Sequence, residues 1–89
     1  MLKGGDMMPL EQMMTLKALR VRKGLTQNDV ANIMGVNRMT IIKWEKDAGN
    51  MPIKYMSRFS ELYKYPMNAI FFGSVISFRD KLNVEEGRK

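Results

Sequence analysis

The chain has 89 residues, 45% of them hydrophobic, which is enough for one small domain with a thin core. It contains no cysteine and no histidine, which excludes disulfide bonds, the usual zinc frameworks and imidazole acid–base chemistry. Fifteen Lys and Arg residues against nine Asp and Glu residues give a formal net charge of +6, which favours a polyanionic partner such as nucleic acid or an anionic membrane surface.

The hydrophobic stretches are too short to cross a membrane. The longest, such as residues 69–72, fall far below the ~20 apolar residues of a membrane-spanning helix, and the N-terminus lacks the apolar core of a signal peptide. We therefore expect a cytoplasmic protein without a membrane partner. No nucleophile–base pair, metal-ligand cluster or phosphate loop is visible, so we expect no enzymatic activity, cofactor, metal ion or small-molecule substrate.

Residues 1–8 contain Gly4 and Gly5 and show no helical periodicity, which predicts a disordered leader. Codons for residues 3–6 can spell a bacterial ribosome-binding sequence just ahead of Met7. Met7 or Met8 is therefore an alternative start to Met1. The rest of the chain divides into a predicted domain at residues 9–73 and a C-terminal extension at residues 74–89, frayed from residue 83.

Residues 9–23 predict a first helix that ends at Gly24. Its inward side consists of Met13, Leu16, Leu19 and Arg20. Two starts remain open, because Pro9 suits a first helical position and Thr15 could equally cap a shorter helix.

Thr26 predicts the N-cap of a second helix, with Asp29 facing the positive end of its dipole. The apolar stripe of this helix consists of Val30, Ala31, Ile33 and Met34. Gly35 ends it with a positive-φ turn, and Asn37 caps a third helix that runs to about residue 46. The inward positions of the third helix are Thr40, Ile41 and Trp44, with Trp44 assigned to the core.

Gly49 and Asn50 predict a turn in a loop at residues 47–51, and Pro52 opens a fourth helix up to about residues 63–64. The stripe of this helix is Ile53, Met56, Phe59, Leu62 and Tyr63. Pro66 starts a fifth helix of one or two turns, with Ile70 and Phe71 inward. Residues 74–78 predict a short strand or a docking extension, and a private core patch and a dimer contact are equally open for them.

The second and third helices with their glycine turn form a helix-turn-helix pattern. Ala31 is small where the two helices cross, and Val36 and Ile41 wedge them together. Between residues 16 and 46 there are seven basic residues and only two acidic ones, so most of the net charge lies on this segment. The pattern predicts that the N-terminal end of the third helix enters a DNA major groove.

The residues predicted to read base edges are Asn37, Arg38, Met39 and Lys43. Arg38 can fork onto guanine, Asn37 can pair with adenine or a phosphate, and Met39 can cover a thymine methyl. Lys43 can read guanine or hold a phosphate. The N-terminus of the second helix is predicted to bind a phosphate. The full set of predicted phosphate contacts is Gln27, Thr26, Asn28, Thr40, Lys46 and Lys54.

These motifs resemble the Cro/C1-type (XRE) helix-turn-helix family of phage repressors and regulators over about residues 16–73. The matching residues are Leu16, Leu19, Arg20, Lys23, Gly24, Leu25, Thr26, Gln27, Val30, Ala31, Met34, Gly35, Val36, Thr40, Ile41, Lys43, Trp44 and Glu45. The resemblance implies an all-α, five-helix, lambda-repressor-like domain whose short fifth helix includes residues 69–72. It also implies a structural ion pair between Arg20 and Glu45, a phosphate-and-support role for Gln27, and base-reading positions at the four residues named above.

Two positions depart from the family pattern. Asp47 stands where the family commonly has glycine, so we expect a longer or differently shaped loop after the third helix. Asn37 replaces the usual serine or threonine, which keeps the cap but changes the base preference.

The sequence therefore predicts a sequence-specific, double-stranded DNA-binding transcription regulator. We expect a repressor, bacterial and nucleoid-associated or phage-encoded, that acts as a homodimer on a palindromic operator. The alternative is a protein-interaction module of the same fold, such as an antitoxin or an anti-repressor partner, in which Met39 and Ile42 form an apolar patch.

Overall fold

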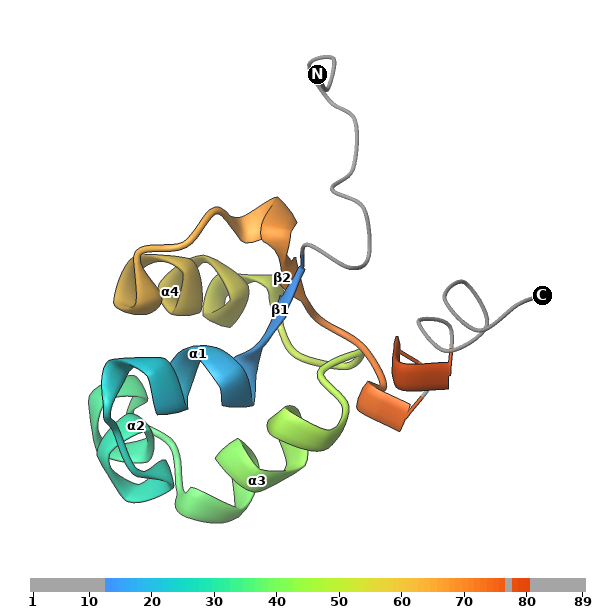
Figure 1. The fold of residues 1–89 in the computed structure, drawn as a ribbon. Coiled ribbons are helices and arrows are strands. Elements are labelled where there is room, and N and C mark those ends of the chain that lie inside the picture. Colours follow the sequence, from blue (N-terminus) through green and yellow to red (C-terminus); the bar gives the residue numbers. More distant parts are fainter. Residues whose placement is uncertain (1–12, 77, 81–89) are drawn as a thin grey trace, which may run out of the picture.

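The computed structural model describes residues 13–76 and 78–80, so the predicted leader, the Pro9 helix start and the frayed end lie outside the described residues. In chain order its elements are β1 (Met14–Thr15), α1 (Leu16–Lys23), α2 (Gln27–Met34), α3 (Arg38–Lys46), α4 (Ile53–Tyr63), the 3-10 turn η2 (Met67–Ala69) and β2 (Ile70–Phe71). In Figure 1, α1 lies between α4 and the α2–α3 pair. The helical fold class is confirmed, and none of the described helices is long and apolar enough to cross a membrane.

Helix α1 begins at Leu16 because the Thr15 hydroxyl accepts a hydrogen bond from the Ala18 N–H at 3.1 Å. It ends at Gly24, which has a φ of 76°. The shorter of the two predicted helices is thus confirmed. A helix over residues 9–23 is wrong at residues 14 and 15, because these residues are extended and pair with β2.

The two helices of the motif are capped as predicted. The Thr26 hydroxyl accepts from the Asp29 N–H, and the Asp29 carboxylate accepts from the Thr26 N–H at 2.9 Å. These hydrogen bonds lower the pKa of the exposed Asp29 carboxyl. Gly35 has a φ of 74°, and the Asn37 side chain caps α3 by accepting from the Thr40 N–H at 2.9 Å. The predicted helix-turn-helix is therefore present in full.

Two short strands join the beginning and the end of the domain. Met14 pairs with Ile70 and Thr15 with Phe71 in a parallel ladder (Figure 1). The predicted fifth helix is confirmed as a single turn, and its extension over residues 70–72 is wrong. It consists of the single turn η2 after Pro66, and residues 70 and 71 are extended because their backbone pairs with β1. Ile70 still lies in the core, while Phe71 is half-buried.

Trp44 lies in the core, as predicted. The Trp44 ring lies 5.0 Å from the Tyr55 ring and 6.0 Å from the Phe59 ring, the latter edge to face. The predicted inward position is wrong for two residues of the apolar stripes. Ile33 is 47% exposed because α2 turns only Val30, Ala31 and Met34 inward, and Ile53 is 74% exposed because it opens α4 before that helix packs.

Helix α4 also holds α2 in place. The Arg58 guanidinium donates two hydrogen bonds of 3.2 Å to the carbonyls of Ile33 and Met34, the last residues of α2. A cation at the C-terminal end of a helix interacts favourably with the helix dipole. The fold therefore connects α4 to the end of α2 next to the Gly35 turn.

The loop after α3 begins at Asp47, where the sequence departs from the family pattern. Asp47 is extended, with a φ of −158°, and its carboxylate accepts from the Gly49 N–H at 2.8 Å. Asp47 also forms an antiparallel bridge with Ser74, and the Ala48 N–H donates to the Gly73 carbonyl at 3.1 Å. The loop is thereby attached to the C-terminal extension.

The extension combines features of both predicted alternatives. Among the described residues of the extension, Ser74 alone has strand-type pairing, and residues 75–76 and 78–80 are helical. Phe78 is buried, with its ring 4.3 Å from the Phe71 ring. The extension therefore packs against β2, beside the C-terminal end of α3 (Figure 1).

Lys64 ends α4 in a left-handed conformation, with φ 52° and ψ 50°. This conformation costs a residue with a Cβ about 1–2 kcal/mol. Glycine avoids that strain but loses more chain entropy on folding, which costs about 0.5–1 kcal/mol. We expect Lys64→Gly to raise the free energy of unfolding by roughly 0.5–1 kcal/mol in urea titrations. Lys64→Ala is the control, and equal stability of the two variants would show that the cap stores no strain.

Candidate DNA interface

The predicted base-reading residues lie together at the N-terminal end of α3 and on its outer face. Asn37, Arg38, Met39 and Lys43 are all exposed, with Met39 at 67%. The Asn37 side-chain oxygen accepts from both the Thr40 N–H and the Thr40 hydroxyl, at 2.9 Å and 3.1 Å. Both lone pairs of that oxygen are engaged in the cap, so its amide NH₂ is the group that faces outward.

A pocket of about 510 Å³, which we call the α2 pocket, lies between α1, the start of α2 and the start of α3. It is lined by Lys17, Arg20, Leu25, Thr26, Gln27, Asn28 and Arg38. Three of the predicted phosphate contacts, Thr26, Gln27 and Asn28, thus share one pocket with the predicted base reader Arg38. Because the Thr26 N–H is bonded to Asp29, the N–H groups of Gln27 and Asn28 are the donors at this end of α2.

The remaining predicted phosphate contacts are dispersed. Thr40 is half-buried beside the Asn37 cap, and Lys46 is exposed at the end of α3. Lys54 lies on the first turn of α4, where its ammonium is 5.2 Å from the centre of the Tyr55 ring. Neither Lys46 nor Lys54 lines the α2 pocket.

Behind the pocket, Arg20 and Glu45 form a bidentate ion pair. Arg20 Nε lies 2.6 Å from Glu45 Oε2 and Arg20 Nη2 lies 3.1 Å from Oε1, while Nη1 donates to the Leu25 carbonyl at 3.0 Å. The two side chains are only 11% and 7% exposed. The hydrogen bond to Glu45 raises the pKa of the Arg20 guanidinium. The pair therefore connects α1 to the end of α3 without presenting a reactive group.

Gln27 belongs to the same network. Its amide Nε2 donates to Glu45 Oε1 at 3.1 Å, so the ion pair fixes the side chain at the start of α2. The sequence placed Gln27 at a phosphate, and its bond to Glu45 is the support that the resemblance implied. The start of α2, the end of α3 and α1 are thereby held in one arrangement.

Tyr63 is a member of this region that the sequence identified only as a stripe residue. Its hydroxyl is buried and makes no hydrogen bond to any residue that the structure describes. Burial raises the pKa of Tyr63 far above its usual value, and the negative charge of Glu45 raises it further. Only the fold could show this, because the proximity of α4 to the ion pair is a tertiary contact.

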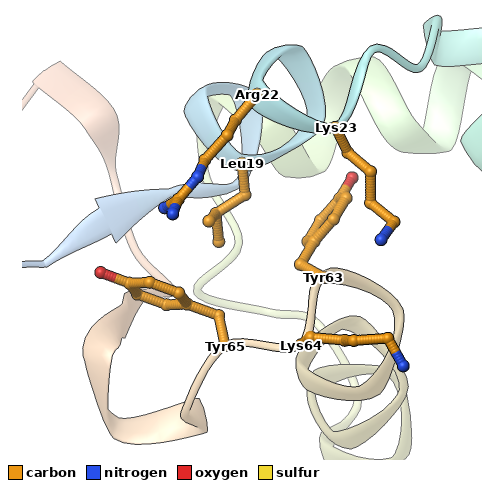
Figure 2. Close-up of a pocket in the computed structure, with 6 residues that line it drawn as sticks. All are labelled: Leu19, Arg22, Lys23, Tyr63, Lys64 and Tyr65. Carbon is orange, nitrogen blue, oxygen red and sulfur yellow. The ribbon is translucent and has the colours of Figure 1, made fainter.

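A second basic pocket lies elsewhere. It measures about 220 Å³ and is lined by Leu19, Arg22, Lys23, Tyr63, Lys64 and Tyr65, from α1 and from the end of α4. Figure 2 shows Tyr63 rising from α4 toward α1, with Arg22 and Tyr65 on one side. The Arg22 guanidinium is 5.9 Å from the centre of the Tyr65 ring. None of the four residues predicted to read bases lines this pocket, so it is a separate surface.

The comparisons with known proteins agree with this geometry. A family model described as helix-turn-helix matches residues 16–70, which include α1 to α4 and the start of β2. A search of curated proteins found no match. The matched residues cover more than half of the chain and contain both capped helices of the motif. The chain therefore belongs to the Cro/C1-type helix-turn-helix family of DNA-binding regulators.

Proposed function

We propose that this protein is a sequence-specific transcription repressor that binds a palindromic operator as a homodimer through the major groove. The observation that carries the proposal is the α2 pocket, in which the exposed Arg38 of α3 meets the N-terminal end of α2. A groove-reading side chain and an anion-binding helix end are thus exposed on one basic surface. Phosphate and base contacts are therefore available at the same time.

In this proposal each predicted base-reading residue makes a different contact. Arg38 forks onto guanine O6 and N7, Lys43 contacts guanine or a phosphate, and the exposed Met39 covers a thymine methyl. Bidentate pairing of Asn37 with adenine would need the oxygen that caps α3. We therefore assign Asn37 a single donated hydrogen bond, to a phosphate or to a base acceptor.

The phosphate contacts position the domain. The N–H groups of Gln27 and Asn28 face one phosphate, and Thr26 contributes by capping α2 rather than by donating its own N–H. Lys46, Lys54 and Thr40 complete the set on α3 and α4. Such contacts add affinity without sequence preference.

Pairing of two copies supplies the specificity that one small domain lacks. A single recognition helix reads only a few base pairs, and half-sites one helical turn apart would double that number. Occupancy of such an operator would repress transcription by excluding the polymerase.

A protein-interaction module, such as an antitoxin or an anti-repressor partner, is the second candidate. Met39 is 67% exposed on the face that would otherwise enter DNA, and an apolar side chain there also suits a protein surface. The two candidates predict different responses to salt, because only phosphate binding releases counterions.

Selection of binding sites from random duplexes at two salt concentrations tests the proposal. We expect enrichment of an inverted repeat whose half-sites are about one helical turn, roughly 34 Å, apart, with affinity that falls steeply with salt. A duplex carrying one half-site is the control and should bind far more weakly. Binding that is indifferent to sequence, or insensitive to salt, would exclude the repressor and favour the interaction module.

A further inference from the structure

Another pocket, distinct from the one near Tyr65, lies next to the α2 pocket. It measures about 450 Å³, and its lining residues are Lys17, Gln27, Ile42, Glu45, Lys46, Val75, Ile76 and Arg79. Lys17 and Gln27 line both pockets, so the two lie side by side, and we call them together the α3 groove. The α3 residues in it, at positions 38, 42, 45 and 46, are spaced along one side of the helix. The groove thus follows the flank of the recognition helix.

The charge of the α3 groove has one sign along its whole length. Four exposed cations line it, namely Lys17, Arg38, Lys46 and Arg79. Glu45 is the one carboxylate among its lining residues, and this group is already bonded to Arg20 and Gln27. The groove therefore presents uncompensated positive charge, and its apolar lining consists of Ile42, Val75 and Ile76.

The C-terminal extension completes the groove. The Asp47–Ser74 bridge and the contact between the Phe78 and Phe71 rings hold the extension so that Val75, Ile76 and Arg79 lie beside the end of α3. Val75 is half-buried, while Ile76 and Arg79 are exposed, so the extension contributes both apolar surface and a guanidinium. Without the extension, the groove would have no lining from this side.

We propose that the α3 groove holds the sugar–phosphate backbone of one DNA strand, and that Arg79 and Lys17 bind its phosphates. The inference rests on the proposed DNA-binding function and extends it to residues outside the matched helix-turn-helix region. A helix in the major groove has a backbone strand along its flank, and such a strand carries one charge per ~3.4 Å of helix axis. The cations along this flank have the opposite sign to that charge, Arg79 can bind a phosphate bidentately, and the apolar lining can contact deoxyribose.

An acidic protein segment is the competing occupant, and the distribution of charge favours DNA. The cations extend from Arg38, next to the anion-binding end of α2, to Arg79 at the far end of α3. Their row therefore continues directly from the surface at which the proposed phosphate contacts already lie. A second copy of this chain is disfavoured as the occupant of the α3 groove, because groove-to-groove packing would bring like charges together.

The test is a salt titration of the duplex selected by the wild-type protein, with Arg79→Ala and Lys17→Ala. Each variant should reduce the slope of log K against log salt by about 0.9 for each phosphate that it no longer binds, and weaken all duplexes alike. Arg79→Lys should recover most of the slope because the charge is kept. Arg22→Ala is the matched control, since it removes an exposed arginine from the separate pocket near Tyr65 and should leave the slope unchanged.

The outcomes separate this inference from the proposed function. If Arg79→Ala and Lys17→Ala keep the wild-type slope and affinity, the groove holds no DNA and the inference is overturned. The inference would also be overturned if Arg79→Ala kept the wild-type slope of log K against log salt but sedimented as a monomer. That result would assign the extension to a dimer contact. If the wild-type protein itself binds no duplex with steep salt dependence, the proposed function has failed. Thermal unfolding of each variant by circular dichroism verifies that Arg79, which is exposed, is not needed for folding.

Discussion

Replacement of Glu45 by alanine should lower the free energy of unfolding by about 2–4 kcal/mol, between the values for a surface pair and for a fully buried pair, because it leaves the largely buried Arg20 guanidinium without its carboxylate. Arg20 is 11% exposed, and the same change removes the acceptor that holds Gln27. Small domains have a total stability of only about 5–15 kcal/mol, so a loss of this size removes a large share of it. Urea unfolding monitored by circular dichroism measures the loss.

Two control variants distinguish a lost charge from lost packing. Glu45→Gln keeps the shape and one acceptor, so it should cost less than Glu45→Ala. The double change of Arg20 to Met and Glu45 to Leu should recover stability relative to Glu45→Ala, because no charge is then buried without a partner. A loss below about 1 kcal/mol for Glu45→Ala would instead be typical of a solvent-screened surface pair.

Arg38→Ala should abolish discrimination at one base pair of each half-site of the operator. A bidentate arginine–guanine pair is worth about 1–3 kcal/mol, and a homodimer makes the contact twice, so the full operator should lose roughly 2–6 kcal/mol. The loss should vanish on duplexes in which that base pair has been changed. Competition binding with single-position variants of the selected duplex locates the position.

Lys46→Ala is the contrast to Arg38→Ala. Both residues are exposed cations of α3, but Lys46 is proposed to contact phosphate only. Its replacement should weaken all duplexes by the same factor and lower the salt slope by about one. If the two variants give the same profile across the duplex set, the division into reader and phosphate contact is wrong.

The central motif was predictable because its determinants are local. Thr26 with Asp29 and Asn37 with Thr40 are caps within one helical turn, and Gly35 meets a steric requirement of its own backbone. Such interactions depend on residue types a few positions apart. The same holds for Thr15 at the start of α1.

The end of the domain was not predictable in the same way. Residues 70 and 71 have an apolar pattern that suits a helix or a strand, and their pairing with Met14 and Thr15 decides for the strand. The helical state of residues 75–76 depends likewise on where Phe78 and Ser74 are held. The pairing of β1 with β2 and the Asp47–Ser74 bridge join segments that lie far apart in the chain.

The amino-acid sequence by itself determined the helix-turn-helix, its caps, its basic character and the family, because these depend on local spacing and on composition. Tertiary structure alone decided that Gln27 is bonded to Glu45, that Ile33 is exposed, and that Arg79 lies beside α3. Each of these depends on packing between distant segments, and a one-dimensional pattern contains no distances between such segments. The shape of the surface proposed to hold DNA therefore follows from the fold, whereas the identity of its central helix follows from the sequence.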